Sequence, residues 1–185
     1  GVGALARKAQ SPGADPARLA EDCARIDAQI AALQQVNRRI LGRLRPAALE
    51  EMGLADAIEA LARGWREARA EIAIDLSLGG AQAKLDETTA ITAYRVVQEG
   101  LTNAFRHSGA SRIAVVIARA GQRLRVEVRD DGTGLPAAVA PAGLGLRGMS
   151  ERVSALGGML WLDNGETGGA RLVAELPLDA AQTQR

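Results

Sequence analysis

Glu99, Asn103 and His107 recur at four-residue intervals in QEGLTNAFRHSG (98–109) and carry side chains that could do chemistry. On a helix the three side chains fall within an arc of roughly 80°. A carboxylate and an amide oxygen one turn apart are hard donors, which suit a magnesium ion that keeps waters and phosphate oxygens. His107 is the only histidine of the chain. Taken alone, it is more typical of a solvated or helix-capping residue than of a metal ligand or a phosphate carrier.

The string RDDGTGL (129–135) is the second candidate. It places Asp130 at the end of a predicted strand, followed by Gly132 and Gly134. Glycine adopts positive φ and lets a ligand approach the backbone closely. Taken alone, this string is equally typical of an ordinary turn.

The string GLGLRGM (143–149) matches G-x-G-x-x-G, and Asp163 follows at about the distance expected of a ribose-binding acid. AVAPA precedes the glycines, whereas a dinucleotide-binding motif requires a strand there. We therefore exclude a dinucleotide site. The string instead predicts a flexible glycine loop that leads into a helix N-terminus, which suits phosphate.

Length and composition narrow the class of protein. The 185 residues suffice for one standard domain with a helical appendage. The 23 basic and 22 acidic residues nearly balance, which argues against a general nucleic-acid binder. A single cysteine excludes an internal disulfide. One cysteine and one histidine together argue against a zinc site of these residues. The sequence contains no apolar run long enough to span a membrane or to act as a secretory signal. Because the chain begins with Gly1, we expect it to be part of a longer protein.

The first part of the chain is predicted to be helical. Residues 1–16 form a flexible N-terminal segment with a truncated helix, and residues 17–70 form a dimerisation region of two helices. We expect these helices, 17–44 and 54–70, to pair as an antiparallel hairpin and to build a four-helix homodimer with a second copy. The alternative is that the first helix lies on the core of its own domain. The seam of the first helix is Leu19, Cys23, Ile26, Ile30, Leu33, Asn37, Ile40 and Leu44.

Residues 71–178 predict an α+β domain, a two-layer α/β sandwich in which helices cover one face of a mixed sheet. We expect helices over 86–107 and near 147–156, and a frayed tail over 179–185. The predicted strands are 71–78, 111–119, 123–130, 159–164 and 169–178.

The order of the three strings is more specific than any one of them. E-x-x-x-N-x-x-x-H, then D-x-G-x-G, then G-x-G-L-x-G-M resembles the N, G1 and G2 boxes of the GHKL ATP-binding superfamily, which has a Bergerat-type fold. LGRLRPAALEEMGLADAIEAL (41–61) narrows the resemblance to two-component sensor histidine kinases of the nitrate-sensor and hexose-phosphate-sensor subgroup. The resemblance covers about residues 17–178.

The resemblance implies a role for each matching residue. Asn103 and Glu99 would hold the Mg2+ that bridges the phosphates of ATP, and Glu99 would also assist catalysis. Asp130 would accept a hydrogen bond from the adenine amino group. The remaining nucleotide-binding residues would be Arg106 and His107 at the phosphates or ribose, Gly132 and Gly134 at the base, and Gly143, Gly145, Arg147 and Gly148 at the hinge of the lid.

Two departures from the family pattern stand out. The family often has Gly-Thr where this chain has Gly169-Ala170, so one polar contact to the nucleotide is missing. In the family the phosphoacceptor histidine lies in the first dimerisation helix, yet here no histidine precedes His107. We therefore expect this chain to bind ATP without phosphorylating itself.

The resemblance implies the ATP-binding catalytic portion of a sensor kinase. The γ-phosphoryl would pass to a histidine and then to an aspartate of a response regulator with a helix-turn-helix output domain. This portion would be a cytoplasmic domain of a protein anchored in the bacterial inner membrane, without contacts of its own to membrane or nucleic acid. Two alternatives stay open: a non-catalytic nucleotide-binding or scaffolding module, and an anti-sigma-type serine kinase or ATPase.

Overall fold

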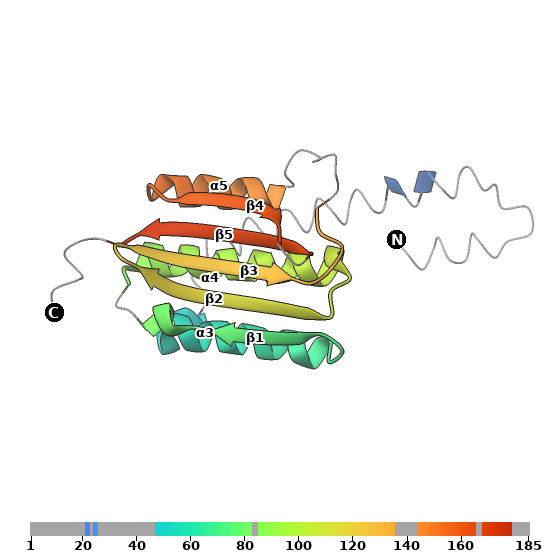
Figure 1. Ribbon diagram of the computed structural model, residues 1–185, viewed down its shortest axis with the longest axis horizontal. Helices are drawn as coiled ribbons and strands as arrows, with labels where there is room; N and C mark the ends of the chain where they lie inside the picture. Colours follow the sequence, from blue (N-terminus) through green and yellow to red (C-terminus); the bar gives the residue numbers. More distant parts are fainter. Residues whose placement is uncertain are drawn as a thin grey trace, which may run out of the picture. The chain divides into compact units, whose positions relative to one another are not determined.

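Figure 1 shows the computed structural model of the chain, which divides into two compact units, residues 1–45 and 46–185. In the first unit the described residues are helical, and Arg25 forms an ion pair with Asp22. The rest of the predicted helix over 17–44, and with it the predicted hairpin, lies outside the described residues. The structure describes residues 21–22, 24–25, 47–82, 85–135, 144–165 and 168–178.

A five-stranded mixed sheet forms the framework of the second unit, as the sequence predicted. Its strand order is β1-β2-β3-β5-β4, with β1 parallel to β2 and every other neighbouring pair antiparallel. A parallel pair needs a crossover connection, and the long helix between β1 and β2 supplies it. The strands are β1 (Ala73–Ser77), β2 (Arg112–Ala120), β3 (Arg123–Asp130), β4 (Met159–Asn164) and β5 (Ala170–Pro177).

Helices cover one face of this sheet (Figure 1). Alternate residues of the strands point to this face and form the core with the helices, as Leu124, Val126 and Val128 of β3 do. The described helices are α3 (Ala47–Ala68), α4 (Glu87–Asn103) and α5 (Leu144–Ala155), with a 3-10 turn η1 (Gly79–Gln82) and a π turn η2 (Ala104–Ser108). No helix among the described residues is long and apolar enough to cross a membrane.

The helical segment made of α4 and η2 begins and ends at clear signals. Asp86 caps its N-terminus, because its side chain accepts a hydrogen bond from Thr89 N at 2.9 Å. The turn η2 continues the helical segment beyond Asn103, and Gly109 ends η2 with φ 62°, a left-handed conformation that glycine tolerates. The helix predicted over 86–107 is therefore present, but its last turn is the π turn η2.

Helix α3 packs on the core of the sheet unit. Leu54 and Ile58 on its apolar stripe are buried in the core of the sheet unit. Trp65 stacks on Phe105 of η2, with ring centroids 4.4 Å apart and planes 9° from parallel. The sequence analysis placed this helix in the dimerisation region 17–70, and that region remains a prediction. The compact unit that contains the helix begins at Pro46. An apolar stripe shows that a helix packs on something, but it does not identify the partner.

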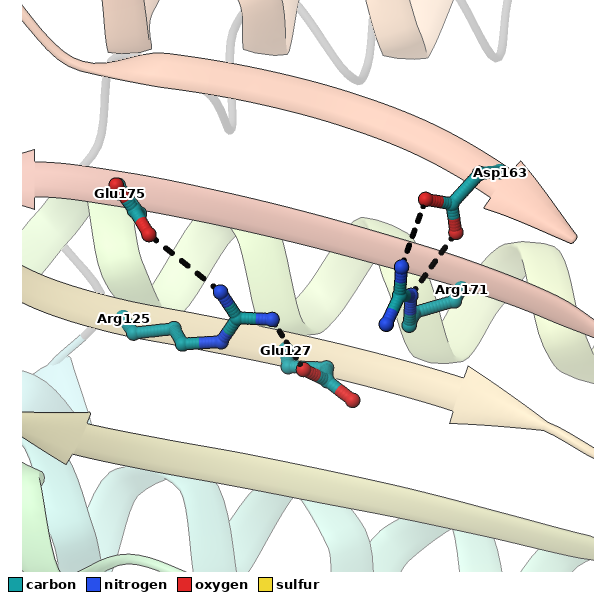
Figure 2. Close-up of polar contacts among 5 residues, drawn as sticks. All are labelled: Arg125, Glu127, Asp163, Arg171 and Glu175. Carbon is teal, nitrogen blue, oxygen red and sulfur yellow. Dashed lines mark hydrogen bonds and ion pairs between the residues drawn. The ribbon is translucent and has the colours of Figure 1, made fainter. Parts of the chain in front are cut away.

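The opposite face of the sheet carries ion pairs (Figure 2). Arg125 Nη2 lies 2.9 Å from Glu127 Oε2, and Arg125 Nη1 lies 3.4 Å from Glu175 Oε1. Arg171 donates two hydrogen bonds of 2.9 Å to Asp163, and this contact lowers the pKa of Asp163. Asp163 is thus engaged with Arg171 on the face away from α4.

Candidate functional site

The first site residues lie at the end of α4. Glu99 and Asn103 are half-buried and one helical turn apart, and Asn103 is the last residue before η2. Arg106 and His107 lie within η2 and are both exposed. A π turn closes through i→i+5 hydrogen bonds and holds more residues than an α turn. His107 therefore departs from the four-residue register that the sequence expectation assumed.

The carboxylate of Glu99 lies against the first turn of α5. A Cβ added at Gly145 would stand 1.8 Å from Glu99 Oε1. Helix α5 starts at Leu144, so this negative charge is close to a helix N-terminus, where the helix dipole favours it. The structure thus brings together two strings that are separated by some forty residues of sequence.

The glycine string between β3 and β4 is more helical than expected. The sequence predicted a flexible glycine loop followed by a helix near 147–156, whereas α5 already begins at Leu144. Gly145, Arg147 and Gly148 are consequently helical, and Arg147 forms an exposed ion pair of 3.2 Å with Glu151. Gly143 lies outside the described residues.

Asp130 is the last residue of β3, and two backbone N–H groups of other residues fix one oxygen of its carboxylate. Its Oδ1 accepts hydrogen bonds from Gly132 N at 2.9 Å and from Ala170 N at 3.3 Å. Among the described residues, no donor reaches Oδ2. One carboxylate oxygen is therefore held by the fold while the other remains an acceptor for a ligand.

The neighbouring Asp131 has a different role. Its carboxylate accepts hydrogen bonds from Ser111 N, Ser111 Oγ and Arg112 N at 2.7–2.9 Å. The bond from the Ser111 hydroxyl and those from the backbone lower the pKa of Asp131. This residue fastens the start of β2 to the end of β3, so the structure separates two adjacent carboxylates that the sequence shows side by side.

Gly132 and Gly134 each lie where a side chain would collide with a neighbour. A Cβ at Gly132 would stand 2.2 Å from Ser108 O, which accepts a 2.9 Å hydrogen bond from Thr133 N. Gly134 has φ 74°, and a Cβ there would stand 2.7 Å from Asn164 Oδ1. The string thus joins the end of η2 to the end of β4.

Asn164 is a residue of this region that the sequence analysis missed. Its Oδ1 accepts a 2.7 Å hydrogen bond from Leu135 N. An asparagine at the end of a predicted strand reads as a turn signal, and nothing in the local sequence relates it to residues almost thirty positions earlier.

The side chains of the candidate site can be compared with what a metal ion requires. In the part of the chain that the structure describes, no three His, Cys, Asp or Glu residues form a group that could hold one. Glu99 and Asn103 offer one carboxylate and one amide. This set fits Mg2+, which takes few protein ligands and completes its shell with waters and phosphate oxygens.

Residues 88–180, which contain all of these contacts, match the profile of the family "Histidine kinase-, DNA gyrase B-, and HSP90-like ATPase". The chain belongs to this ATPase family. The strings that contain Glu99, Asp130 and Gly145 all lie within the matched residues. This confirms the resemblance and the ATP expectation.

Curated relatives of this ATPase domain are sensor kinases. The chain is 41% identical over 140 residues to the signal transduction histidine-protein kinase/phosphatase UhpB of Salmonella typhimurium. The match covers 76% of this chain and 28% of that protein. The chain is 36% identical to the sensor histidine kinase MctS of Rhizobium johnstonii, over 84% of this chain and 34% of the relative. It is 31% identical to the sensor histidine kinase LiaS of Bacillus subtilis, over 78% of this chain and 40% of the relative. The chain thus spans well under half the length of each.

Solved structures confirm the fold. The blue-light activated histidine kinase of Erythrobacter litoralis EL346 is 26% identical, with a TM-score of 0.57, over 68% of this chain and 42% of that one. The catalytic domain of the histidine kinase ThkA has a TM-score of 0.55 at 19% identity, over 68% of this chain and 93% of that one. The α+β sandwich with a mixed sheet is therefore the ATP-binding fold of histidine kinases.

Proposed function

We propose that the unit over residues 46–185 binds ATP with Mg2+ and presents the γ-phosphoryl group to a histidine, as the catalytic portion of a sensor histidine kinase. The observation that supports this most is the contact between Glu99 and Gly145. It joins a metal-binding pair on α4 to a helix N-terminus suited to phosphate.

At the base end, Asp130 is the adenine-recognising residue of this proposal. Its Oδ2 is available to accept a hydrogen bond from an exocyclic amine, because Oδ1 is held by two backbone N–H groups. Guanine has a carbonyl oxygen where adenine has this amine, so it would leave the carboxylate without its partner. Gly132 and Gly134 let Ser108 and Asn164 approach this backbone closely.

At the phosphate end, Asn103 and Glu99 would hold Mg2+, and the ion would neutralise charge on the phosphates. Glu99 would in addition take the proton or orient a water during transfer. Arg106 and His107 are exposed just beyond Asn103, and they would contact the phosphates or the ribose. Gly143, Gly145, Arg147 and Gly148 would border the phosphates. Transfer then depends mainly on positioning and electrostatic stabilisation.

The wider assembly also belongs to the proposal. The helix over 17–44 would mediate a homodimer, and the phosphoryl group would pass from histidine to an aspartate of a response regulator with a helix-turn-helix output domain. We propose the boundary between dimerisation and catalytic regions at residue 46, where the compact unit begins. The parent protein would be anchored in the inner membrane, with this portion in the cytoplasm.

Calorimetric titration with ATP and Mg2+ tests the binding step. Asn103→Ala should lower the affinity at least about tenfold, because it removes a ligand of the metal. Glu59→Gln on the exposed side of α3 is the matched control and should bind as the unchanged protein does. If the unchanged protein shows no heat of binding at millimolar ATP, the proposal is wrong.

The transfer step needs a separate assay. A histidine-bearing dimerisation helix of a related sensor kinase, added in trans with labelled ATP, should acquire acid-labile phosphohistidine. Steady hydrolysis of ATP without any labelled histidine would instead favour an ATPase.

A further inference from the structure

Three residues of three neighbouring strands meet at the end of the sheet: Asp130 of β3, Ala170 of β5 and Asn164 of β4. Ala170 N donates a hydrogen bond to Asp130 Oδ1 at 3.3 Å, and Ala170 is the register partner of Asn164. Register partners of antiparallel strands point to the same face of a sheet. Asn164 and Ala170 therefore share a face.

That face is the one covered by the helices. Two residues inward along the same strands, Leu162 pairs with Leu172, and Leu172 is buried in the core. Because side chains alternate along a strand, Asn164 points to the same side as these leucines. It is also exposed, since it lies where the sheet ends.

Asn164 reaches from this position to the chain after Asp130. Its Oδ1 accepts the 2.7 Å hydrogen bond from Leu135 N and stands 2.7 Å from where a Cβ of Gly134 would be. Gly169 lies on the other side of this chain segment. It approaches so closely that an added Cβ would stand 1.8 Å from Asp130 O. Segment 130–135 is thus enclosed between the ends of β4 and β5.

We propose that Asn164 is a positioning residue for nucleobase binding, acting through segment 130–135. This inference rests on the proposed ATP-binding function. Among the described residues, the Asn164 side chain is the one acceptor for the N–H of Leu135, so it sets the path of the backbone just beyond Asp130. It supplies a polar contact next to Ala170, whose methyl group supplies none.

Asn164 should affect binding of the nucleobase and not binding of the phosphates. Asn164 contacts the string that contains Asp130, while the Glu99–Gly145 contact belongs to other elements. Loss of the Asn164 acceptor should therefore weaken binding of adenine nucleotides and leave binding of inorganic tripolyphosphate with Mg2+ unchanged.

Two variants test this. Asn164→Leu keeps the size of the side chain but removes the acceptor, and Asn164→Asp retains an oxygen for Leu135 N. We expect Asn164→Leu to bind ATP about fivefold more weakly, as the loss of one neutral hydrogen bond implies, with a reduced preference for ATP over GTP. Asn164→Asp should stay within about twofold of the unchanged protein.

The measurements are titrations with ATP, GTP and magnesium tripolyphosphate, together with the thermal midpoint. Equal losses for ATP and tripolyphosphate would overturn the proposal, because they would indicate a general loss of structure. ATP binding by Asn164→Leu equal to that of the unchanged protein would also overturn it. So would an Asn164→Asp variant as weak as Asn164→Leu, because the acceptor would then not be the part that matters. If the unchanged protein binds no ATP, the proposed function itself fails.

Discussion

Glu99 Oε1 lies 1.8 Å from the point where a Cβ of residue 145 would be, so the carboxylate occupies the space of the side chain that Gly145 lacks. This relationship joins α4 to the N-terminus of α5 within the candidate site. It explains why a helical position holds glycine, which is otherwise unfavourable inside a helix by roughly 1 kcal/mol relative to alanine.

Gly145→Ala should displace the Glu99 carboxylate and lower the affinity for ATP with Mg2+ about tenfold. The thermal midpoint should change little, because the displaced group is the end of a flexible side chain and alanine favours the helix. Titration and thermal unfolding check this. In a Glu99→Ala background the same substitution should have no further effect on binding, and a full additional loss there would contradict the explanation.

Gly64→Ala is the matched control for that experiment. Gly64 lies within α3 and is exposed, and nothing stands within 4 Å of an added Cβ. The substitution should raise the free energy of unfolding by about 0.5–1 kcal/mol without altering nucleotide affinity. Chemical denaturation measures the first quantity and titration the second.

Gly100→Ala should lower the free energy of unfolding by about 1–3 kcal/mol, because α4 packs too closely on β3 to admit a methyl group. A Cβ at Gly100 would stand 2.8 Å from Val128 Cβ and from Val128 Cγ2. Val128→Ala alone removes buried methyl groups and should also destabilise the protein. Denaturant unfolding of the double variant should show less destabilisation than the sum of the two, and strict additivity would refute the contact.

Asp131→Ala should lower the thermal midpoint near neutral pH, because Asp131 fastens Ser111 and Arg112 to the end of β3. The folded pKa of Asp131 lies below its ordinary value of 3.8. Its stabilising contribution is therefore complete above that value and is lost as the pH falls through the lowered pKa. The difference in midpoint between variant and unchanged protein should be constant from pH 5 to 8, by this argument, and should shrink below about pH 3.8.

Asp56→Ala is the control for the pH series. Asp56 is exposed on α3. Its replacement removes a carboxylate without cutting a contact between strands, so the midpoint should stay nearly unchanged. A pH-independent loss at Asp131, persisting in acid, would show that the contact does not depend on the charge of its carboxylate.

The strands and α4 could be predicted because their signals are local. Alternation in 123–130 marks a half-buried strand, and Gly109 marks the end of the helical segment. The π turn could not be predicted in this way. It changes the register of His107 relative to Asn103 without changing the composition of the segment.

The sequence by itself determined the alternation of helices and strands, the order of the three strings and hence the ATP-binding family. Each of these depends on residue types at short separations. The tertiary structure decided which residues meet: α3 with the sheet unit, Glu99 with Gly145, and Asn164 with Leu135. These contacts join segments that are distant in sequence, and they arise from packing and hydrogen bonding across elements, which periodicity does not encode.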